Sequence, residues 1–296
     1  MGSLEELCGL FGKTRQAFYE GGWRKEKESM EAALVLTQIA LIRKELPKVG
    51  TRKLQYLLKD FFVQHHIKMG RDALFSLLMG EGLLVKKRRR KVSTTNSRHR
   101  FRKYPNLVRE LEFVRSEQVW VCDITYIALQ KGFCYLSLIT DAYSKKIVGY
   151  NLEATLETEG CVKALAMALS TRSTPSKHGL IHHSDRGIQY CSTAYVQLLL
   201  ASHISISMTE KSDPYENAIA ERINGILKDE FDLGRTFQNI HQANSVVQES
   251  ITLYNSKRPH SSISYLTPDR AHVENAGLTK HWKTYTKKAI NGNNPG

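Results

Sequence analysis

The chain lacks the features that mark disulfide-rich, zinc-ribbon and membrane proteins. The five cysteines are Cys8, Cys122, Cys134, Cys161 and Cys191. Their number is odd and none forms a Cys-x-x-Cys pair, so neither a disulfide framework nor a thiolate zinc site is predicted. The longest apolar-leaning run, 32–42, is too short to span a bilayer, and no signal peptide opens the chain. We therefore expect a soluble, cytoplasmic protein with buried thiols and no membrane partner.

Acidic residues are scarce in the first third of the chain. Residues 1–104 hold 23 Lys and Arg against 10 Asp and Glu, whereas residues 105–296 hold 20 against 19. Nearly all of the formal net charge of +14 therefore lies before residue 105. This asymmetry predicts a polyanion-binding region joined to an almost neutral core. A chain of 296 residues with 41% hydrophobic residues is long enough for two or three domains with real cores.

Two aspartates stand in or directly after predicted strands. Residues 120–127, WVCDITYI, are rich in β-branched and aromatic side chains and predict a buried strand that contains Asp123. A buried unpaired carboxylate is costly, so a purely structural role for Asp123 is hard to justify. The short apolar stretch 179–184 predicts a second strand, and Asp185 follows it. Taken alone, Asp185 in SDRG is also explained as a turn former.

A third acidic residue, Glu221, is predicted on a helix. Apolar residues recur at helical spacing around it, Pro214 suits the first turn, and Asp213 suits the N-cap. This places Glu221 about two turns into the helix. Asn217 and Lys228 are then expected on the same face as DNA contacts, where Lys228 could hold a phosphate as a point charge. Taken alone, Glu221 is equally well explained as a solvated helix residue.

The three carboxylates together predict a site for two divalent cations. Magnesium prefers octahedral oxygen coordination by a few carboxylates, water and phosphate, which suits an acidic set without sulfur. Asp141, which ends another predicted strand, we interpret as a turn or capping residue. His182 and His183 precede Asp185 and fit either a phosphate or metal contact or ordinary core packing. Neither has a histidine or cysteine partner at zinc-site spacing.

The first ninety residues predict a helical DNA-binding region. Residues 4–20 fit a helix-turn-helix whose second helix opens at 13–16, or a plain helical hairpin. Further helices are predicted at about 28–46, from 51 and from 70, with a short strand or wing at 82–85. The expected phosphate contacts in this region are Arg52, Lys53 and Arg71.

Two basic clusters, KKRRRK at 86–91 and RHRFRK at 98–103, flank a polar spacer. The interleaved Phe101 and Tyr104 favour a linker that follows DNA backbone over a merely solvated tail. The candidate contacts here are Lys87, Arg88, Arg89, Arg100 and Arg102. The predicted domains are a helical DNA-binding region at 1–91, a basic linker at 92–104, a catalytic core with a C-terminal helical segment at 105–272, and a tail at 273–296.

The order of elements in the core predicts an α/β fold. Strands are expected at 120–127, 133–140, 147–152, 179–184 and 204–208, and helices at 157–171, 193–201, around Glu221 and at 240–256. Three antiparallel strands followed by alternating helices and strands indicate a mixed five-stranded sheet flanked by helices. In the segment after the last helix, Arg258 and His260 are candidates for DNA or core contacts.

These motifs together resemble one family. HHSDRGIQY at 182–190, thirty-five residues between Asp185 and Glu221, a lysine seven residues after Glu221, and YNSKRPHSSISYLTP at 254–268 resemble integrase-type DDE transposases of bacterial insertion sequences. More narrowly, the chain is similar to the second-frame product of the insertion-sequence-three family, which has a retroviral-integrase-like core. The resemblance is strongest over 105–270. It implies a ribonuclease-H-like sheet with Asp123 and Asp185 on adjacent strands.

The resemblance also implies an activity. Asp123, Asp185 and Glu221 would be catalytic and would hold two Mg²⁺ ions, with Mn²⁺ as a substitute. The expected reactions are nicking of insertion-sequence ends and strand transfer by 3′-OH attack on a phosphodiester. The expected partners are terminal inverted repeats, target DNA and further copies of the chain on paired ends, at the nucleoid. The alternatives are a catalytically inactive integrase-like DNA-binding regulator and a ribonuclease-H-type nuclease.

Overall fold

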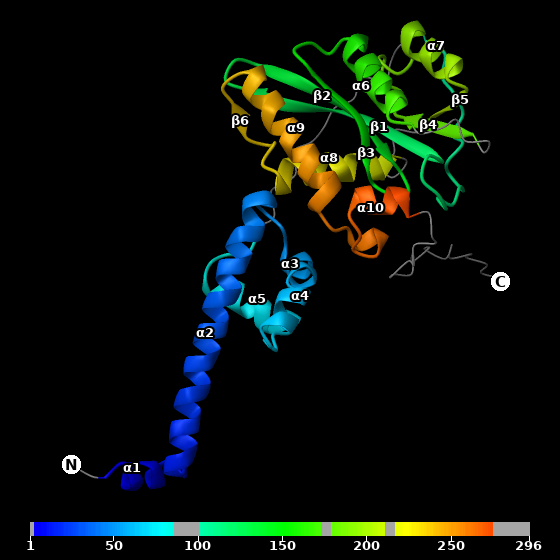
Figure 1. The fold of residues 1–296 in the computed structure, drawn as a ribbon. Coiled ribbons are helices and arrows are strands. Elements are labelled where there is room, and N and C mark those ends of the chain that lie inside the picture. Colours follow the sequence, from blue (N-terminus) through cyan, green and yellow to red (C-terminus); the bar gives the residue numbers. More distant parts are fainter. Residues whose placement is uncertain (1–2, 86–100, 173–178, 211–216, 275–296) are drawn as a thin grey trace, which may run out of the picture. The chain divides into compact units, whose positions relative to one another are not determined.

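The computed structural model describes residues 3–85, 101–172, 179–210 and 217–274 (Figure 1). The chain divides into two compact units, Met1–Arg90 and Lys91–Gly296. Four of the basic candidates, Lys87, Arg88, Arg89 and Arg100, lie outside the described residues. The same holds for Asp213 and Pro214, which were expected to begin the Glu221 helix.

The first unit is helical. Its helices are α1 (Leu4–Leu10), α2 (Arg15–Glu45), α3 (Thr51–Leu57), α4 (Lys59–Gln64) and α5 (Arg71–Gly80). Ser3 and Glu6 form a capping box on α1, and the Thr14 hydroxyl caps α2 by accepting from Ala17 N. A small core of buried residues joins α2, α3 and α5; it includes Val35, Ile39, Leu54, Leu74 and Leu78.

Two expectations for this unit are wrong. The helix expected to start near Glu28 is the second half of α2, which runs unbroken for 31 residues. Gly21 and Gly22 do not interrupt it, because each glycine costs only about 1 kcal/mol and the flanking residues are good helix formers. No strand forms at 83–85, where the chain is irregular and Leu83 O accepts a hydrogen bond from Arg43 Nη2 (2.8 Å).

The second unit is built on one mixed sheet. Its strands are β1 (Val119–Leu129), β2 (Phe133–Asp141), β3 (Ile147–Glu153), β4 (Leu180–Ser184), β5 (Ile204–Met208) and the two-residue β6 (Thr236–Phe237). The order is β3-β2-β1-β4-β5, and β6 pairs with the end of β1. The β1–β2 and β2–β3 pairs are antiparallel, whereas β4 and β5 run parallel to β1. This is the expected ribonuclease-H-like arrangement of five strands.

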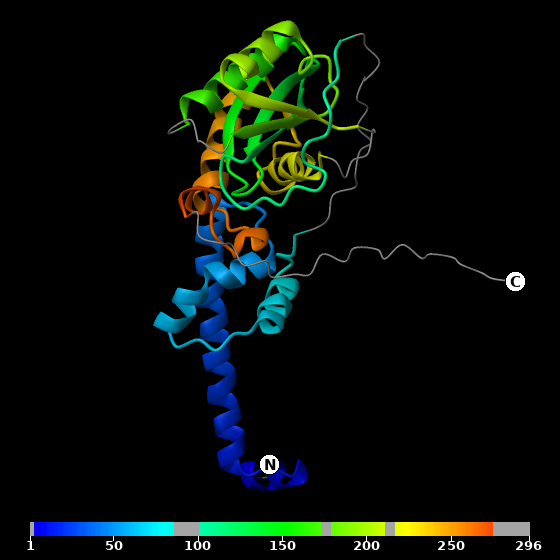
Figure 2. The ribbon, with the colours of Figure 1, turned by 90° about the vertical axis from the view of Figure 1, so that its right-hand side faces the viewer.

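Helices cover both faces of this sheet (Figure 2). They are α6 (Thr158–Ser170), α7 (Thr193–Ala201), α8 (Ala218–Glu230), α9 (Ile240–Lys257) and α10 (Pro268–Val273), with a 3-10 turn at Ser261–Ile263. Trp120 and Cys122 pack in the core that contains α6 and α7 residues, and Val119 and Val121 pack with Ala220 of α8. Because strand residues alternate between faces, Asp123 points to the α8 side.

The cysteines behave as the sequence predicts. All five are free and buried.

No helix in the described part of the chain is long and apolar enough to cross a membrane.

Close packing of α6 on β3 depends on one glycine. A Cβ at Gly149 would overlap the Ala164 carbonyl oxygen and approach the Ala168 backbone nitrogen to 2.9 Å. We predict that Gly149→Ala lowers the free energy of unfolding by about 1–3 kcal/mol, the usual cost of overpacking. The matched control is Gly225→Ala in α8, where a Cβ would meet no described atom within 4 Å and should be neutral or mildly stabilising. Equal urea midpoints for the two variants would contradict the prediction.

Candidate active site

Asp123 lies in the middle of β1 and faces α8. Its Oδ2 accepts a hydrogen bond from Asn224 Nδ2 of α8 (2.7 Å), and its Oδ1 accepts one from Ile124 N (2.9 Å). The side chain of Asn224 is 6% exposed, so its contact with Asp123 is largely shielded from water. These two donors fix the orientation of the Asp123 carboxylate before any ligand binds.

Asp185 follows the C-terminal end of β4, the strand next to β1. The parallel register pairs Val121 with His183, and continuing it by two residues brings Asp185 level with Asp123. Gly187 N donates to Asp185 Oδ1 (2.9 Å) and closes a tight turn at this point. The expectation that the two aspartates belong to adjacent strands is confirmed.

Glu221 is in the first turn of α8 and not two turns in, because the helix begins at Ala218. Asn217 takes the N-cap position with φ −125° and ψ 29°, outside helical geometry. Its side chain is buried and donates from Nδ2 to the Cys122 carbonyl oxygen (2.8 Å). The predicted DNA contact at Asn217 is therefore wrong, because this amide is used to join the start of α8 to β1.

The three carboxylates influence one another electrostatically. Burial raises the pKa of Asp123 to about 7, and the negative charge of Asp185 adds to the rise. Glu221 acts in the same direction more weakly, while the hydrogen bonds from Asn224 and Ile124 lower the pKa. A carboxylate held beside two like charges is a common feature of functional sites.

The structure does not bring these groups into a closed metal cage. Among the residues it describes, no three His, Cys, Asp or Glu side chains are arranged to hold a metal ion together. The donor chemistry nevertheless fits a hard divalent cation, because the donors are carboxylate oxygens and a cation would relieve the repulsion that raises the pKa of Asp123. Holding an ion would require the three carboxylates to draw closer than they are here.

Neighbouring acidic and histidine residues have structural roles. Asp141 is fully buried and accepts from Ser144 N (2.8 Å), Ser144 Oγ (2.7 Å) and Glu117 N (2.7 Å), so its interpretation as a turn residue is confirmed. His182 Nε2 lies 2.7 Å from Cys122 Sγ and 2.8 Å from the Tyr195 hydroxyl. Burial lowers the pKa of His182 to about 3, so the ring is a neutral core residue.

Of the two roles left open for Arg258, a DNA contact or a core contact, the structure shows the core contact. The Arg258 side chain is 2% exposed and binds Glu230 through Nε–Oε2 (2.8 Å) and Nη2–Oε1 (2.7 Å). A guanidinium buried and paired in this way cannot reach a phosphate. The other described candidates are accessible to different degrees: Arg52, Arg71 and Arg102 are exposed, whereas Lys53 and Lys228 are half-buried. Arg71 Nε also donates to its neighbour Asp72 (2.8 Å).

Comparison with known proteins identifies the family. Two models described as integrase core domain match residues 114–214 and 202–268. A 31 kDa protein of insertion element IS600 from Shigella sonnei is 37% identical over 88% of this chain and 96% of its own length. The transposase for IS629, from the same organism, is 33% identical over 69% of this chain and 68% of its own length. The chain belongs to the bacterial insertion-sequence transposases.

A further relative agrees with this assignment. Transposase InsF of insertion sequence IS3A from Escherichia coli K12 is 31% identical over 67% of this chain and 69% of its own length. This similarity agrees with the predicted resemblance to the insertion-sequence-three family. The HTLV-2 integrase catalytic core covers 54% of this chain and 98% of its own, with 18% identity and a TM-score of 0.42. The family models and the transposase relatives make this transposase a polynucleotidyl transferase that functions in DNA transposition.

Sequence reasoning missed Asn224 of the transposase. The signal was present, because Asn224 is one helical turn from Glu221 and stands among apolar residues on a face that packs inward. A polar residue at such a position needs a partner, and that partner is Asp123. The sequence alone could not say which of the nearby polar groups this partner would be.

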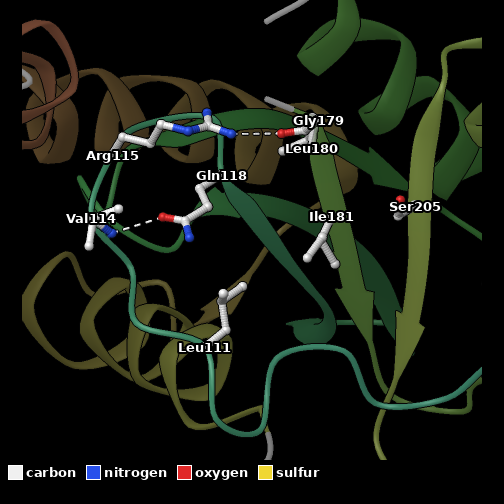
Figure 3. Close-up of a pocket in the computed structure, with 8 residues that line it drawn as sticks. All are labelled: Leu111, Val114, Arg115, Gln118, Gly179, Leu180, Ile181 and Ser205. Atoms are coloured by element: carbon white, nitrogen blue, oxygen red, sulfur yellow. Dashed lines mark hydrogen bonds between the residues drawn. The ribbon is translucent and has the colours of Figure 1, made fainter. Parts of the chain in front are cut away.

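The transposase also has a pocket that is separate from the carboxylates. It has a volume of about 580 Å³ and lies among Leu111, Val114, Arg115, Gln118, Gly179, Leu180, Ile181 and Ser205 (Figure 3). Arg115 Nη2 donates to Gly179 O at its rim (2.8 Å). The pocket lies where β4 begins, whereas Asp185 follows the other end of that strand, and no carboxylate lines it. It is therefore not the site of the transfer chemistry.

Raising the pKa of Asp123 has a measurable effect on stability. A carboxyl group whose folded pKa of about 7 exceeds its ordinary value of 3.8 favours folding below pH 4 and loses that contribution as pH rises through 7. We predict that Asp123→Asn is as stable as the wild type near pH 4 and more stable at pH 8 without divalent metal, by on the order of 2–4 kcal/mol. Urea denaturation in EDTA between pH 4 and pH 8 measures the free energy of unfolding of both proteins. If the two free energies change with pH in parallel, the prediction is contradicted.

Proposed function

We propose that the transposase cuts and joins DNA with Asp123, Asp185 and Glu221 as its catalytic and metal-binding residues. The observation that carries this proposal is the position of Asp123 on β1, where burial raises its pKa and the charges of Asp185, after β4, and Glu221, at the start of α8, add to the rise. Two-metal phosphodiester chemistry needs carboxylate oxygens as ligands, and these three acidic side chains of the integrase core would supply them once drawn together around the ions. The same residues follow the motif spacing by which the chain resembles DDE transposases.

Asp123, Asp185 and Glu221 would together hold two Mg²⁺ ions. When bound, the ions would activate the nucleophile and stabilise the leaving 3′-oxygen. In nicking, a water oxygen forms a bond to phosphorus and the bond from phosphorus to the 3′-oxygen breaks, leaving a 3′-OH and a 5′-phosphate. In strand transfer, that 3′-OH attacks a phosphodiester of the target, so one ester replaces another without an external energy source.

Other residues of the chain would prepare and hold the substrate. The amide of Asn224 and the backbone of Ile124 orient Asp123, and Gly187 N orients Asp185. Lys228, two turns along α8 from Glu221 and therefore on the same face, would hold a neighbouring phosphate. Arg52, Lys53, Arg71 and Arg102, together with the basic residues at 86–100, would bind the backbone of the element end. Copies of the chain would assemble on the paired ends.

The central test is the change Glu221→Gln, which keeps the shape of the side chain and removes its charge. We expect DNA binding to persist and cleavage of a labelled duplex carrying the element end to fall by more than about 100-fold, since even outer-shell partners of a metal site cost up to that factor. Glu249→Gln on the exposed surface of α9 is the matched control and should cleave normally. Normal nicking by the Glu221 variant would refute its role. An inactive wild type in Mg²⁺ would favour the inactive regulator.

Lys228 is tested through salt dependence. A lysine that neutralises one phosphate releases about one counterion, so Lys228→Ala should weaken end binding and make the slope of log K against log salt shallower by about 1. Fluorescence anisotropy from low to moderate salt measures this slope. Lys163→Ala is the matched control, because that ammonium pairs with Glu153 and Glu159 and should leave the slope unchanged. An unchanged slope for Lys228→Ala would remove this lysine from the interface.

A further inference from the structure

The segment YNSKR at 254–258 links three parts of the transposase core. Tyr254 is fully buried, and its hydroxyl donates to Lys145 O at the β2–β3 turn (2.8 Å). Asn255 bonds the first residue of β3 twice, with Oδ1 accepting from Ile147 N (3.0 Å) and Nδ2 donating to Ile147 O (2.9 Å). The end of α9 is thereby fixed to the sheet at its β3 edge.

From this fixed point, Arg258 reaches the end of α8. Its guanidinium binds both oxygens of Glu230, the last residue of α8, and lies 5.8 Å from the Tyr254 ring centroid. The geometry is the side-on bidentate form, which restricts orientation more strongly than a single contact. With Glu230 itself 16% exposed, the pair is largely shielded from water.

The start and the middle of α8 are bound to β1. Asn217 donates to the Cys122 carbonyl oxygen, and Asn224 donates to Asp123. Glu230 follows Glu221 by nine residues, which at 3.6 residues per turn places the two on opposite sides of the helix. The contact of Glu230 at the C-terminal end and the contacts of Asn217 and Asn224 with β1 lie at different angles around the helix, so together they fix how far α8 is rotated about its axis.

Stability alone does not account for such a pair. Burying two charges costs several kcal/mol, and well-packed apolar residues in the same place are often as stable or more stable. A bidentate pair differs from an apolar contact in setting one orientation. Glu221 and Lys228 both lie on α8. The rotation of α8 that the ion pair sets therefore decides where both side chains point.

We infer that Arg258 and Glu230 are positioning residues for the transfer reaction, which set the rotation of α8 and so aim Glu221 at the aspartates. This inference rests on the proposed role of Glu221. Tyr254 and Asn255 hold the end of α9 from which Arg258 acts. The buried residues of the YNSKR segment, Tyr254 and Arg258, thus act on the reaction from outside the site.

The test replaces the pair by apolar residues of similar size, Glu230→Leu with Arg258→Met. We expect a melting temperature at or above that of the wild type and unchanged binding of a labelled element end. We also expect kcat for cleavage to fall by about 10- to 100-fold, the usual effect of losing an outer-shell partner, and calorimetry to show weaker Mg²⁺ binding. A stable double variant with wild-type kcat and Mg²⁺ affinity would overturn the inference.

A conservative variant covers the case in which the double variant does not fold. Arg258→Lys keeps the positive charge and loses the second hydrogen bond to Glu230. At a temperature where it is folded, it should show the same loss of kcat at unchanged KM for DNA, and wild-type kcat would again overturn the inference. The control is the exposed pair on α10, Arg270→Met with Glu274→Leu, which should change nothing.

Failure of the inference differs from failure of the proposed function. If the wild type and Glu221→Gln cleave alike, the role of Glu221 is wrong, whatever the Arg258 variants do. If Glu221→Gln is inactive and both Arg258 variants match the wild type, only the positioning role is wrong.

Discussion

A carboxylate inside a strand is the constraint on which this core depends. Asp123 takes the place of an apolar side chain in β1, beside the charges of Asp185 and Glu221, and burial and repulsion together hold its pKa near 7. The sheet compensates for that cost elsewhere, through the tightly packed residues on either side of β1. An unfavourable group that the surrounding fold maintains indicates a function, since it adds nothing to stability by itself.

Comparison with Asp141 shows how two carboxylates in one sheet can have different purposes. Asp141 accepts three hydrogen bonds from nearby donors and ends β2, so its charge is satisfied within the fold. Asp123 has two donors and two like charges beside it. Asp141 is the more deeply buried of the two, so the difference lies in the balance of donors against like charges and not in the depth of burial. That balance separates a structural turn from a group that a bound cation would stabilise.

Most strands and helices of the core were predictable, because their apolar periodicity agrees with their tertiary surroundings. The strand of Asp123 and the helix at 193–201 are examples. Errors arose where a polar side chain could bind either the chain itself or a ligand. Asn217 and Arg258 looked like DNA contacts, and both turned out to bond within the protein. Residue type cannot show whether such a side chain binds the protein or DNA. An amide or guanidinium group can donate hydrogen bonds to a carbonyl, a carboxylate or a phosphate oxygen.

The sequence by itself determined which side chains could carry the chemistry, since motif spacing and the misfit of Asp123 in an apolar strand are properties of the chain. It also determined the alternation that sends Asp123 to one face of the sheet. Only the tertiary structure decided that Asn224 orients Asp123 and that Arg258 holds Glu230. The physical reason is that such partners are far apart in the chain, and their meeting depends on strand register and on the rotation of α8, which no local pattern specifies.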